Sequence, residues 1–301
     1  MKFNGILLFS RCPMLTLNKI LLPVDFPHTA LPVLHQAATL ARHFRSEIVM
    51  LHVVTPRSRA AGVPAVGHVP AGWNMLDEVF KIARKNDDQL LQPDLSGLSI
   101  RAQLVDGDPP EAIMESADRE KADLIMMPSH GFTFDQFLLG TVPAKILYAT
   151  NCPVWTAGHL QNSPSQKFAI RSVLCAVDFR AHTRKTVSWA VQLAGEFNAR
   201  LTLAHVTAGV ESWGPGGGFV NPQWQKELVG DASAHMADLQ AEMGTNAGVF
   251  IGSGDVPKAL GQAAEQTSAD LLVTGFQPYG GYLKTHGYAV ITALPIPVLS
   301  I

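Results

Sequence analysis

The amino-acid sequence predicts two α/β domains in tandem, each built on a doubly wound sheet of five parallel strands. The first observation behind this prediction is length, because 301 residues suffice for two domains of ~100–200 residues each. The second is an internal repeat, and the third is that each half alternates short apolar runs with amphipathic helical segments. Strands that alternate with helices pair in parallel through right-handed crossovers, which produces an open, doubly wound sheet.

The internal repeat is visible at many points in the same order. Residues 19–26 read KILLPVDF and residues 172–179 read SVLCAVDF, so that Asp25 and Asp178 end two matching apolar runs. Further matches pair His52-Val53 with His205-Val206, Gly107-Asp108 with Gly254-Asp255, Ala122-Asp123 with Ala269-Asp270, and Gly140 with Gly287. So many matched positions in one order indicate a duplicated domain.

Apolar spacing identifies the elements of each copy. The first helix carries apolar residues at the i, i+3, i+4 and i+7 positions in both copies: Leu34, Ala37, Ala38 and Ala41, then Val187, Ala190, Val191 and Ala194. The strands are unbroken apolar runs, which are typical of a parallel sheet buried on both faces. Residues 48–51 and 123–127 are examples of such runs. The expected strands include residues 46–54, 123–127 and 153–156 of the first copy, and residues 199–207 and 297–300 of the second. Residues 55–72 and 208–222 are rich in Gly, Pro and Ala and are predicted as loops.

Domain boundaries follow from these elements. We expect domain 1 at residues 14–158 and domain 2 at residues 168–301. Residues 159–167 are polar and contain proline, which is typical of a linker. Residues 1–13 precede the first strand-like run and are expected to be an upstream extension rather than a signal peptide.

Composition excludes several classes of function. The net charge of −2 offers no basic surface for nucleic acid. No apolar run reaches the ~18 residues that a membrane span needs. The three cysteines, Cys12, Cys152 and Cys175, form no disulfide framework and no zinc-type cluster, which favours a reducing compartment and a cytoplasmic location. Cys152 and Cys175 lie in apolar runs and are expected to be inert, buried thiols.

Candidate ligand-binding residues lie where the strands end. Open α/β sheets bind ligands at the carboxyl ends of their strands, where the strand order reverses. Asp25 ends the first strand, Val53 lies near the end of the second and Gly107 follows the third, while residues 127–141 follow the fourth. Asp25 is therefore a candidate to hydrogen-bond a base or a ribose, and the alternative is a carboxylate that only caps the end of the sheet.

The segment after the fourth strand has the features of a phosphate loop. Gly140-Thr141 precede a predicted helix that begins at Val142, and Thr141 is a suitable N-cap. A helix N-terminus offers free N–H groups and a positive dipole end to phosphate. Gly131 and Gly140 allow close approach of the backbone, and His130 is placed to face an anion or solvent. The alternative is an ordinary helix cap after a loop.

These residues resemble those of the universal stress protein family. The likeness covers residues 18–157 and about 168–301, and it depends on the strand-1 aspartate and on a loop of the form G-x2-G-x9-G-(S/T). It implies a Rossmann-like, adenine-nucleotide α-hydrolase-like fold whose fifth strands pair between the two copies, and a role in the stress response. It also implies binding of ATP, or of AMP or ADP, with Mg or Mn. The residues implicated in domain 1 are Asp25, Val53, Gly107, Met127, His130, Gly131, Gly140, Thr141 and Val142.

The sequence departs from the family's loop in both copies. In domain 1, Pro128 replaces the first glycine, and one residue fewer separates Gly131 from Gly140. In domain 2, Pro278 replaces the second glycine, and Tyr288 replaces the small hydroxyl residue. A weaker site is therefore expected there, with Asp178, Val206, Gly254, Gly275 and Gly287. We expect domain 2 to act mainly as the structural partner of domain 1 in an intramolecular pseudo-dimer; the sequence also allows a homodimer.

Two other functions remain open from the sequence. If the loops have lost their ligand, the chain is an interaction scaffold without a nucleotide. If they position a water molecule, it is a slow nucleotide hydrolase, but no general base is evident. The chain has no G-x4-G-K-[ST] phosphate loop and no G-x-S-x-G elbow. His28 and His182 follow the two strand-1 aspartates without a third ligand at fixed spacing, so no metal site is predicted.

Overall fold

The computed structural model describes residues 15–24, 31–60, 62–85, 95–128, 142–158, 168–209, 211–214, 217–220, 222–275 and 289–301. It confirms the predicted fold class, two doubly wound α/β domains in tandem. Domain 1 contains β1 (Lys19–Pro23), α1 (Leu31–Phe44), β2 (Glu47–Val54), α2 (Pro56–Ala60), α3 (Met75–Lys85), β3 (Ser99–Asp106), α4 (Pro109–Glu120), β4 (Leu124–Pro128), α5 (Val142–Ala149) and β5 (Val154–Ala157).

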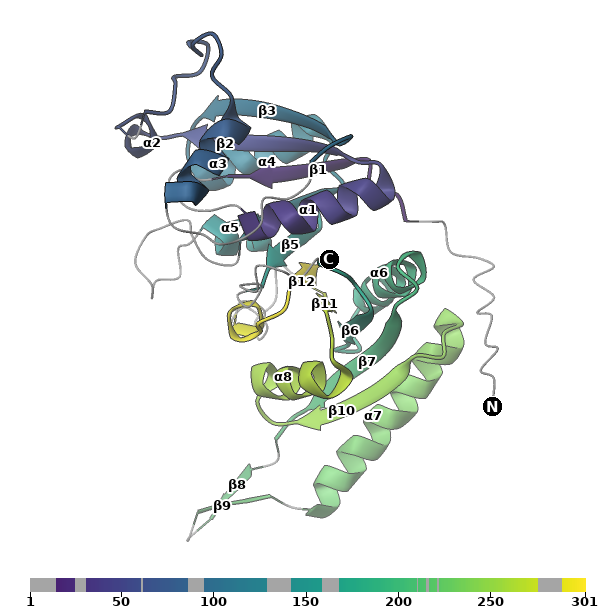
Figure 1. Cartoon of the computed structure of the whole chain (residues 1–301). Helices are drawn as coiled ribbons and strands as arrows, with labels where there is room; N and C mark the ends of the chain where they lie inside the picture. The colour runs from purple at the N-terminus through teal and green to yellow at the C-terminus, as the bar shows by residue number, and fades with distance from the viewer. Residues whose placement is uncertain are drawn as a thin grey trace.

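Domain 2 repeats this plan, with the strands β8 and β9 where domain 1 has the short helix α2. It contains β6 (Ser172–Ala176), α6 (Thr183–Glu196), β7 (Arg200–Thr207), β8 (Glu211–Gly214), β9 (Gly217–Val220), α7 (Pro222–Met243), β10 (Gly248–Ser253), α8 (Val256–Thr267), β11 (Leu271–Thr274) and β12 (Val298–Ser300). Residues 289–293 are also helical. Figure 1 shows how the two sets of elements follow one another.

The prediction of loops at residues 55–72 and 208–222 was wrong for parts of both segments. The first contains the short helix α2, and the second contains β8 and β9, which pair as an antiparallel hairpin. The residues between these strands are Pro215-Gly216, while Trp213, Phe219 and Val220 are residue types that favour strands. The high content of glycine and proline in residues 208–222 led to the prediction of a loop, although the segment also contains two strands. The hairpin projects from the sheet next to the start of α7 (Figure 1).

All ten strands other than β8 and β9 form one continuous sheet. Its order is β10-β7-β6-β11-β12-β5-β4-β1-β2-β3. Strands within each domain are parallel, while β5 and β12 pair antiparallel, with Trp155 opposite Leu299. This pairing confirms the expected association of the fifth strands. Because the two halves meet antiparallel, the carboxyl ends of their strands point to opposite edges of the sheet, and the two predicted ligand sites lie apart.

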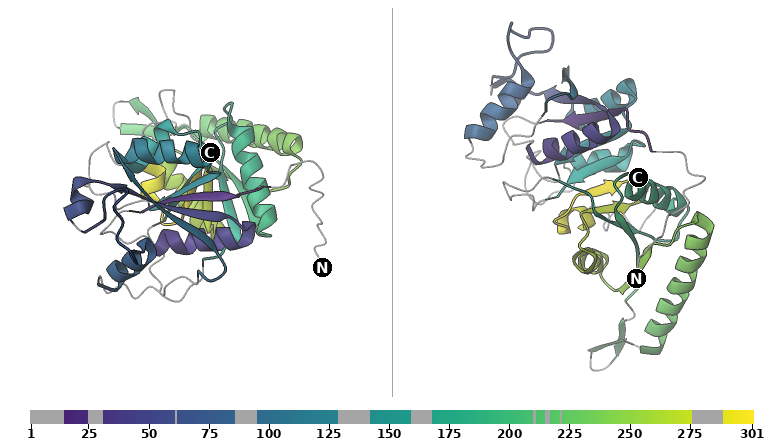
Figure 2. Two further views of the ribbon diagram at one scale, coloured as in Figure 1. Left: turned by 90° about the horizontal axis from the view of Figure 1, so that it is seen from above. Right: turned by 45° about the vertical axis from the view of Figure 1, so that its right-hand side comes forward.

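Helices cover both faces of the sheet (Figure 2). One apolar core lies under α1, α3, α6 and α7, and the other lies under α4, α5, α8 and residues 289–293. The central strands are buried on both sides, as their unbroken apolar runs predict. The strands at the two ends of the sheet, β3 and β10, are partly exposed instead. No helix within the described ranges is long and apolar enough to cross a membrane.

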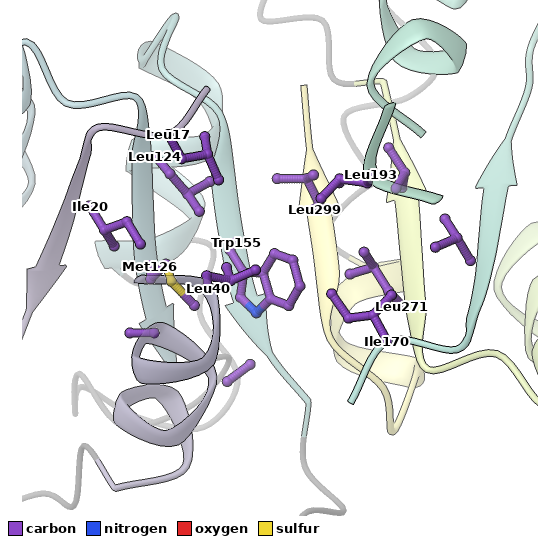
Figure 3. Packing of buried hydrophobic residues seen from close by; sticks show 14 of the residues in the cluster. Leu17, Ile20, Leu40, Leu124, Met126, Trp155, Ile170, Leu193, Leu271 and Leu299 are labelled. Atoms are coloured by element: carbon purple, nitrogen blue, oxygen red, sulfur yellow. The ribbon is translucent and has the colours of Figure 1, made fainter. Parts of the chain in front are cut away.

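Among the described residues, Trp155 is the largest fully buried side chain, and it lies in the core under α1, α3, α6 and α7. Figure 3 shows it between core residues of domain 1 and core residues of domain 2. Its Nε1–H donates a hydrogen bond to Oε1 of the buried Gln36 on α1, with a distance of 2.6 Å. Its ring also meets Phe168, which leads into domain 2, edge to face at 6.0 Å between centroids. Trp155 therefore joins α1, β5 and the beginning of domain 2.

The repeated Ala-Asp pair has the same structural role in both domains. Asp123 Oδ2 accepts backbone hydrogen bonds from Asn18 and Lys19 at 2.7 and 2.9 Å. Asp270 Oδ2 accepts the corresponding bonds from Arg171 and Ser172 at 2.8 and 3.0 Å. Each carboxylate thus ties the beginning of the fourth strand to the beginning of the first, and the match seen in the sequence reflects strand alignment rather than a ligand site.

Replacing Asp270 with alanine is expected to lower the free energy of unfolding by about 1–2 kcal/mol, because two N–H groups lose a charged acceptor while solvent partly replaces it. The Asp123→Ala variant is expected to behave alike. Urea denaturation followed by circular dichroism measures both. Asp231→Ala, at an exposed position of α7, is the control. Equal losses in all three variants would contradict this role.

Candidate functional site

A cavity of about 480 Å³ lies at the carboxyl edge of domain 2; we call it the domain 2 cavity. Four of the five residues predicted for a domain 2 site line it: Asp178, Val206, Gly254 and Gly275. It opens where β6 lies between β7 and β11. The chain leaves β6 through α6 on one face and enters β11 through α8 on the other. This is the reversal of strand order at which such sheets bind ligands, and the volume is within the range of ~300–1,000 Å³ common for ligand sites.

Asp178 is held in place by its own loop. Its Oδ1 accepts hydrogen bonds from the backbone N of Arg180 at 3.0 Å and from Oγ1 of Thr183 at 2.9 Å. Its Oδ2 is buried and accepts no hydrogen bond from the described residues, although Nε2 of His182 lies 3.3 Å away. One carboxylate oxygen therefore fixes the side chain, and the other lies buried beside the imidazole of His182 and the guanidinium of Arg180.

His182 forms the wall between Asp178 and the end of β11. It is the N-cap residue of α6. Its ring lies against Gly275, so that a Cβ at this glycine would overlap the ring and would come within 2.8 Å of Thr186 Oγ1. A larger residue at position 275 would therefore displace the His182 ring, a contact that spacing in the sequence did not reveal.

The end of β10 forms the opposite wall of the cavity. Gly254 follows this strand with a φ of +88°, a conformation that glycine adopts without strain. Asp255 comes next and is the N-cap of α8, with Oδ1 accepting a hydrogen bond from Lys258 N at 3.0 Å. The positive end of this helix is therefore already occupied by a carboxylate.

His205 lines the same cavity from β7. Its Nδ1 lies 2.7 Å from the carbonyl oxygen of Val177, the residue before Asp178. A carbonyl only accepts, so the proton is on Nδ1 in this bond. The ring also packs against Phe179 at 4.5 Å between centroids, and Phe179 has a φ of +57°. His205 thus supports the turn that carries Asp178.

The corresponding histidine of domain 1 makes the same contact. Nδ1 of His52 lies 2.8 Å from the carbonyl oxygen of Val24, the residue before Asp25. Burial lowers the pKa of His52 below its ordinary value, and the bond to Val24 opposes this shift. The duplicated His-Val pair therefore supports the end of the first strand in both domains. The repeat was the signal in the sequence that could have identified this role.

The structure describes four of the residues predicted for the domain 1 site. Val53 lies near the end of β2 and pairs with Val105 on β3. Gly107 directly follows β3 with a φ of +146°, Met127 is fully buried near the end of β4, and Val142 is the first residue of α5. All four occupy the carboxyl edge, as expected. The remaining predicted residues lie outside the described ranges: Asp25, His130, Gly131, Gly140, Thr141 and, in domain 2, Gly287.

Two cysteines lie in the described part of the chain, both as free thiols. Cys175 is fully buried on β6, and burial raises its thiol pKa. Cys152 is partly buried, donates to the carbonyl of Ala122 at 3.2 Å, and has its pKa raised to about 12, mainly by burial. Neither forms the reactive thiolate at neutral pH. Across the described ranges, no three His, Cys, Asp or Glu side chains gather in a metal-binding group.

Comparison with known sequences matches both halves of the chain to the same protein family. The model of the universal stress protein family matches residues 16–157 and again residues 169–300. A universal stress protein of Methanocaldococcus jannaschii is 30% identical over 142 residues, which cover 46% of this chain and 79% of that protein. Universal stress protein A of Escherichia coli is 28% identical over 137 residues, which cover 44% of this chain and 93% of that protein. Each relative thus corresponds to about half of the chain.

Two solved structures resemble nearly the whole chain in fold. A universal stress protein from Archaeoglobus fulgidus has a TM-score of 0.62 at 21% identity, covering 94% of this chain and 95% of that one. A functionally unknown protein from Pseudomonas aeruginosa has a TM-score of 0.63 at 17% identity, covering 95% and 92%. At these identities the likeness shows the fold alone.

Proposed function

Because the chain belongs to the universal stress protein family, we propose that it is a stress-response regulatory protein that binds ATP in domain 1. Fold and family do not by themselves define a ligand, so the proposal rests on the residues at the carboxyl edge. The cytoplasmic location and the boundaries at residues 14–158, 159–167 and 168–301 stay predictions.

The observation that carries this proposal is the position of the domain 2 cavity. It is built by Asp178, Val206 and Gly254, whose counterparts in the repeat are Asp25, Val53 and Gly107. The domain 2 cavity thus lies at positions that correspond, through the internal repeat, to the candidate residues of domain 1. Domain 1 offers additional residues for an anion there, because Gly131 and Gly140-Thr141 precede α5.

Each group in domain 1 has a chemical role in this proposal. Asp25 accepts a hydrogen bond from the base or the ribose, and Val53 and Met127 border the base. Gly131, Gly140 and Thr141 bring backbone N–H groups and a hydroxyl to the phosphates at the N-terminus of α5. His130 donates to a phosphate oxygen. Mg or Mn accompanies the phosphates as their counterion.

Domain 2 serves mainly as the structural partner in this proposal. Support comes from the antiparallel pairing of β5 with β12 and from the apolar core that the two domains share on one face of the sheet. A second contact joins the ends of α1 and α6, where the rings of Phe44 and Phe197 lie 6.0 Å apart. Nε2 of His43 also lies 3.2 Å from Oε2 of Glu196.

The test is calorimetric titration of the full chain with ATP and Mg, together with analysis of nucleotide released when the purified protein is denatured. We expect one ATP per chain, and we expect Asp25→Ala and Thr141→Ala each to weaken binding by about tenfold, because a charged or hydroxyl partner is lost. Tyr288→Ala, at the corresponding helix start of domain 2, is the matched control and should bind ATP unchanged.

The two rival functions give different results in the same assay. No released nucleotide and no heat at millimolar ATP would refute ATP binding and favour the interaction scaffold. Steady phosphate release, in amounts far above the protein concentration, would favour the slow hydrolase. An equal loss of affinity in Tyr288→Ala would contradict the assignment of the working site to domain 1.

A further inference from the structure

A smaller cavity, of about 130 Å³, lies between the two domains; we call it the junction cavity. Domain 1 lines it with residues from the end of α5 to the start of β5, and domain 2 with the start of α6 and the end of β12. One water molecule needs ~10–15 Å³, and sites for larger ligands occupy ~300–1,000 Å³, so the volume suits a small polyatomic group. The polar side chains of its described lining belong to Thr150, Asn151, Cys152, His182, Lys185 and Ser300.

Buried polar atoms without hydrogen bonds gather beside this cavity. Ser300 is 3% exposed, and its Oγ forms no hydrogen bond with the described residues. Nδ1 of His182 is also buried and unpaired in this part of the chain, as is Oδ2 of Asp178, which lies 3.3 Å from Nε2 of the same ring. Three of the six such atoms within the described ranges therefore line the cavity or contact His182. Because native proteins leave few buried polar atoms unpaired, this group indicates a bound polar species.

The charge of the lining depends on His182. Lys185 is exposed in the first turn of α6, and its charge reaches the domain 1 side of the cavity. Burial raises the pKa of the Cys152 thiol to about 12, while the charge of Lys185 acts to lower it. Ile301 also lines the cavity, and its main-chain carboxylate offsets the charge of Lys185. A net positive charge therefore requires that His182 be protonated.

The surroundings of His182 favour this protonated form. An imidazolium donates from both nitrogens, and Nε2 lies beside the carboxylate of Asp178, whose negative charge stabilises the cation. Nδ1–H is then a second donor on the opposite side of the ring. The other titratable groups on the side of the domain 2 cavity are Arg180, which lies 3.8 Å from the same carboxylate oxygen, His205 and Asp255. The side chain of His182 does not cap α6, so the positive end of this helix also acts on the site.

We propose that the junction cavity binds one small oxyanion, of the sulfate or phosphate type, together with a proton on His182. The charges of Lys185 and His182 attract the anion, the hydroxyl of Ser300 donates to it, and the amide of Asn151 closes the site from domain 1. The inference goes beyond the proposed function and does not depend on it, because this cavity lies at the start of β5, at the opposite edge from the candidate nucleotide residues of domain 1.

The test is calorimetric titration of the full chain with sodium sulfate, at about pH 5.5 and at about pH 8, the range in which histidine ordinarily changes its charge. Sulfate is a dianion throughout, so a change in affinity reports the protein. The Thr141→Ala variant is the background, because it removes a hydroxyl of the phosphate loop proposed in domain 1. We expect one sulfate per chain at the lower pH and about tenfold weaker binding at the higher pH, because the imidazolium donor is lost. Inorganic phosphate should compete with sulfate.

Two variants and one control locate the anion. Lys185→Gln and Ser300→Ala, each added to this background, should weaken sulfate binding by about fivefold to tenfold. Lys226→Gln is the same change at an exposed position of α7 and should leave the affinity unchanged. Both test variants are expected to fold, since Lys185 is exposed and Ser300→Ala removes an unpaired hydroxyl, and circular dichroism verifies this.

Three results would each overturn the proposal. They are the absence of saturable sulfate binding at the lower pH, equal affinity at both pH values, and a loss in Lys226→Gln as large as that in Lys185→Gln. Failure of the ATP proposal has a different signature, because it is measured with ATP in the unmodified chain.

Discussion

The Trp155→Ala variant is expected to lose about 3–5 kcal/mol of unfolding free energy, the range for truncating a large aromatic residue in a packed core. Trp155 is 1% exposed and lies at the junction of the two domains (Figure 3). Its removal leaves a cavity between α1, β5 and Phe168, and it leaves Oε1 of the buried Gln36 without its indole donor. Both effects act against the folded state.

Urea denaturation followed by circular dichroism measures this loss, with Trp224→Ala as the matched control. Trp224 is 60% exposed on α7, so the same truncation there should change the stability by less than about 0.5 kcal/mol. A Trp155→Phe variant separates the two effects, because it keeps most of the volume and removes the N–H donor. If Trp155→Ala and Trp224→Ala cost the same, the junction is not the packed core described above.

The Gly158→Ala variant is expected to cost about 2–3 kcal/mol, near the upper end of what overpacking costs. Gly158 follows β5 where the chain passes the loop before β12. A Cβ there would overlap the backbone carbonyl group of Pro295 and would lie 2.7 Å from its carbonyl carbon. Backbone atoms cannot rotate away as a side chain can, so β5 and β12 must separate. We expect thermal unfolding to begin at this junction and to lose its single cooperative transition.

Gly230→Ala provides the control for this second prediction. Gly230 lies within α7, and nothing is within 4 Å of a Cβ added there. Alanine is the better helix former by about 0.8–1.0 kcal/mol, so this variant should be more stable than the parent chain. Scanning calorimetry distinguishes the two cases. A Gly158→Ala protein as stable as Gly230→Ala would show that the two fifth strands do not approach as closely as described.

The predicted fold rests on local signals, and these signals are reliable where an element is buried. Unbroken apolar runs predicted the central strands, including β4 and β5, because strands covered on both faces need apolar side chains at every position. The same reasoning is weaker at β3 and β10, where exposure on one side admits polar residues. It failed at residues 208–222, where glycine and proline predicted a loop and the structure has the β8–β9 hairpin.

The candidate site was predictable only to the extent that it depends on strand ends. Asp178, Val206, Gly254 and Gly275 were expected near one another because each follows or ends a parallel strand, and the structure places all four around one cavity. The partners of these residues were not predictable. Thr183 and His182 contact Asp178 from the start of α6, and the choice of these side chains has no periodic signature.

The sequence by itself determined that the chain is a duplicated α/β domain with its candidate ligand residues at the carboxyl ends of the strands, because repeats, apolar periodicity and glycine positions are local properties. Only the tertiary structure decided which side chains contact one another around the domain 2 cavity. His182 and Gly275 are far apart in the chain and meet because β6 pairs with β11. The space that remains at the end of β11 depends on this long-range contact, which no local pattern in the sequence encodes.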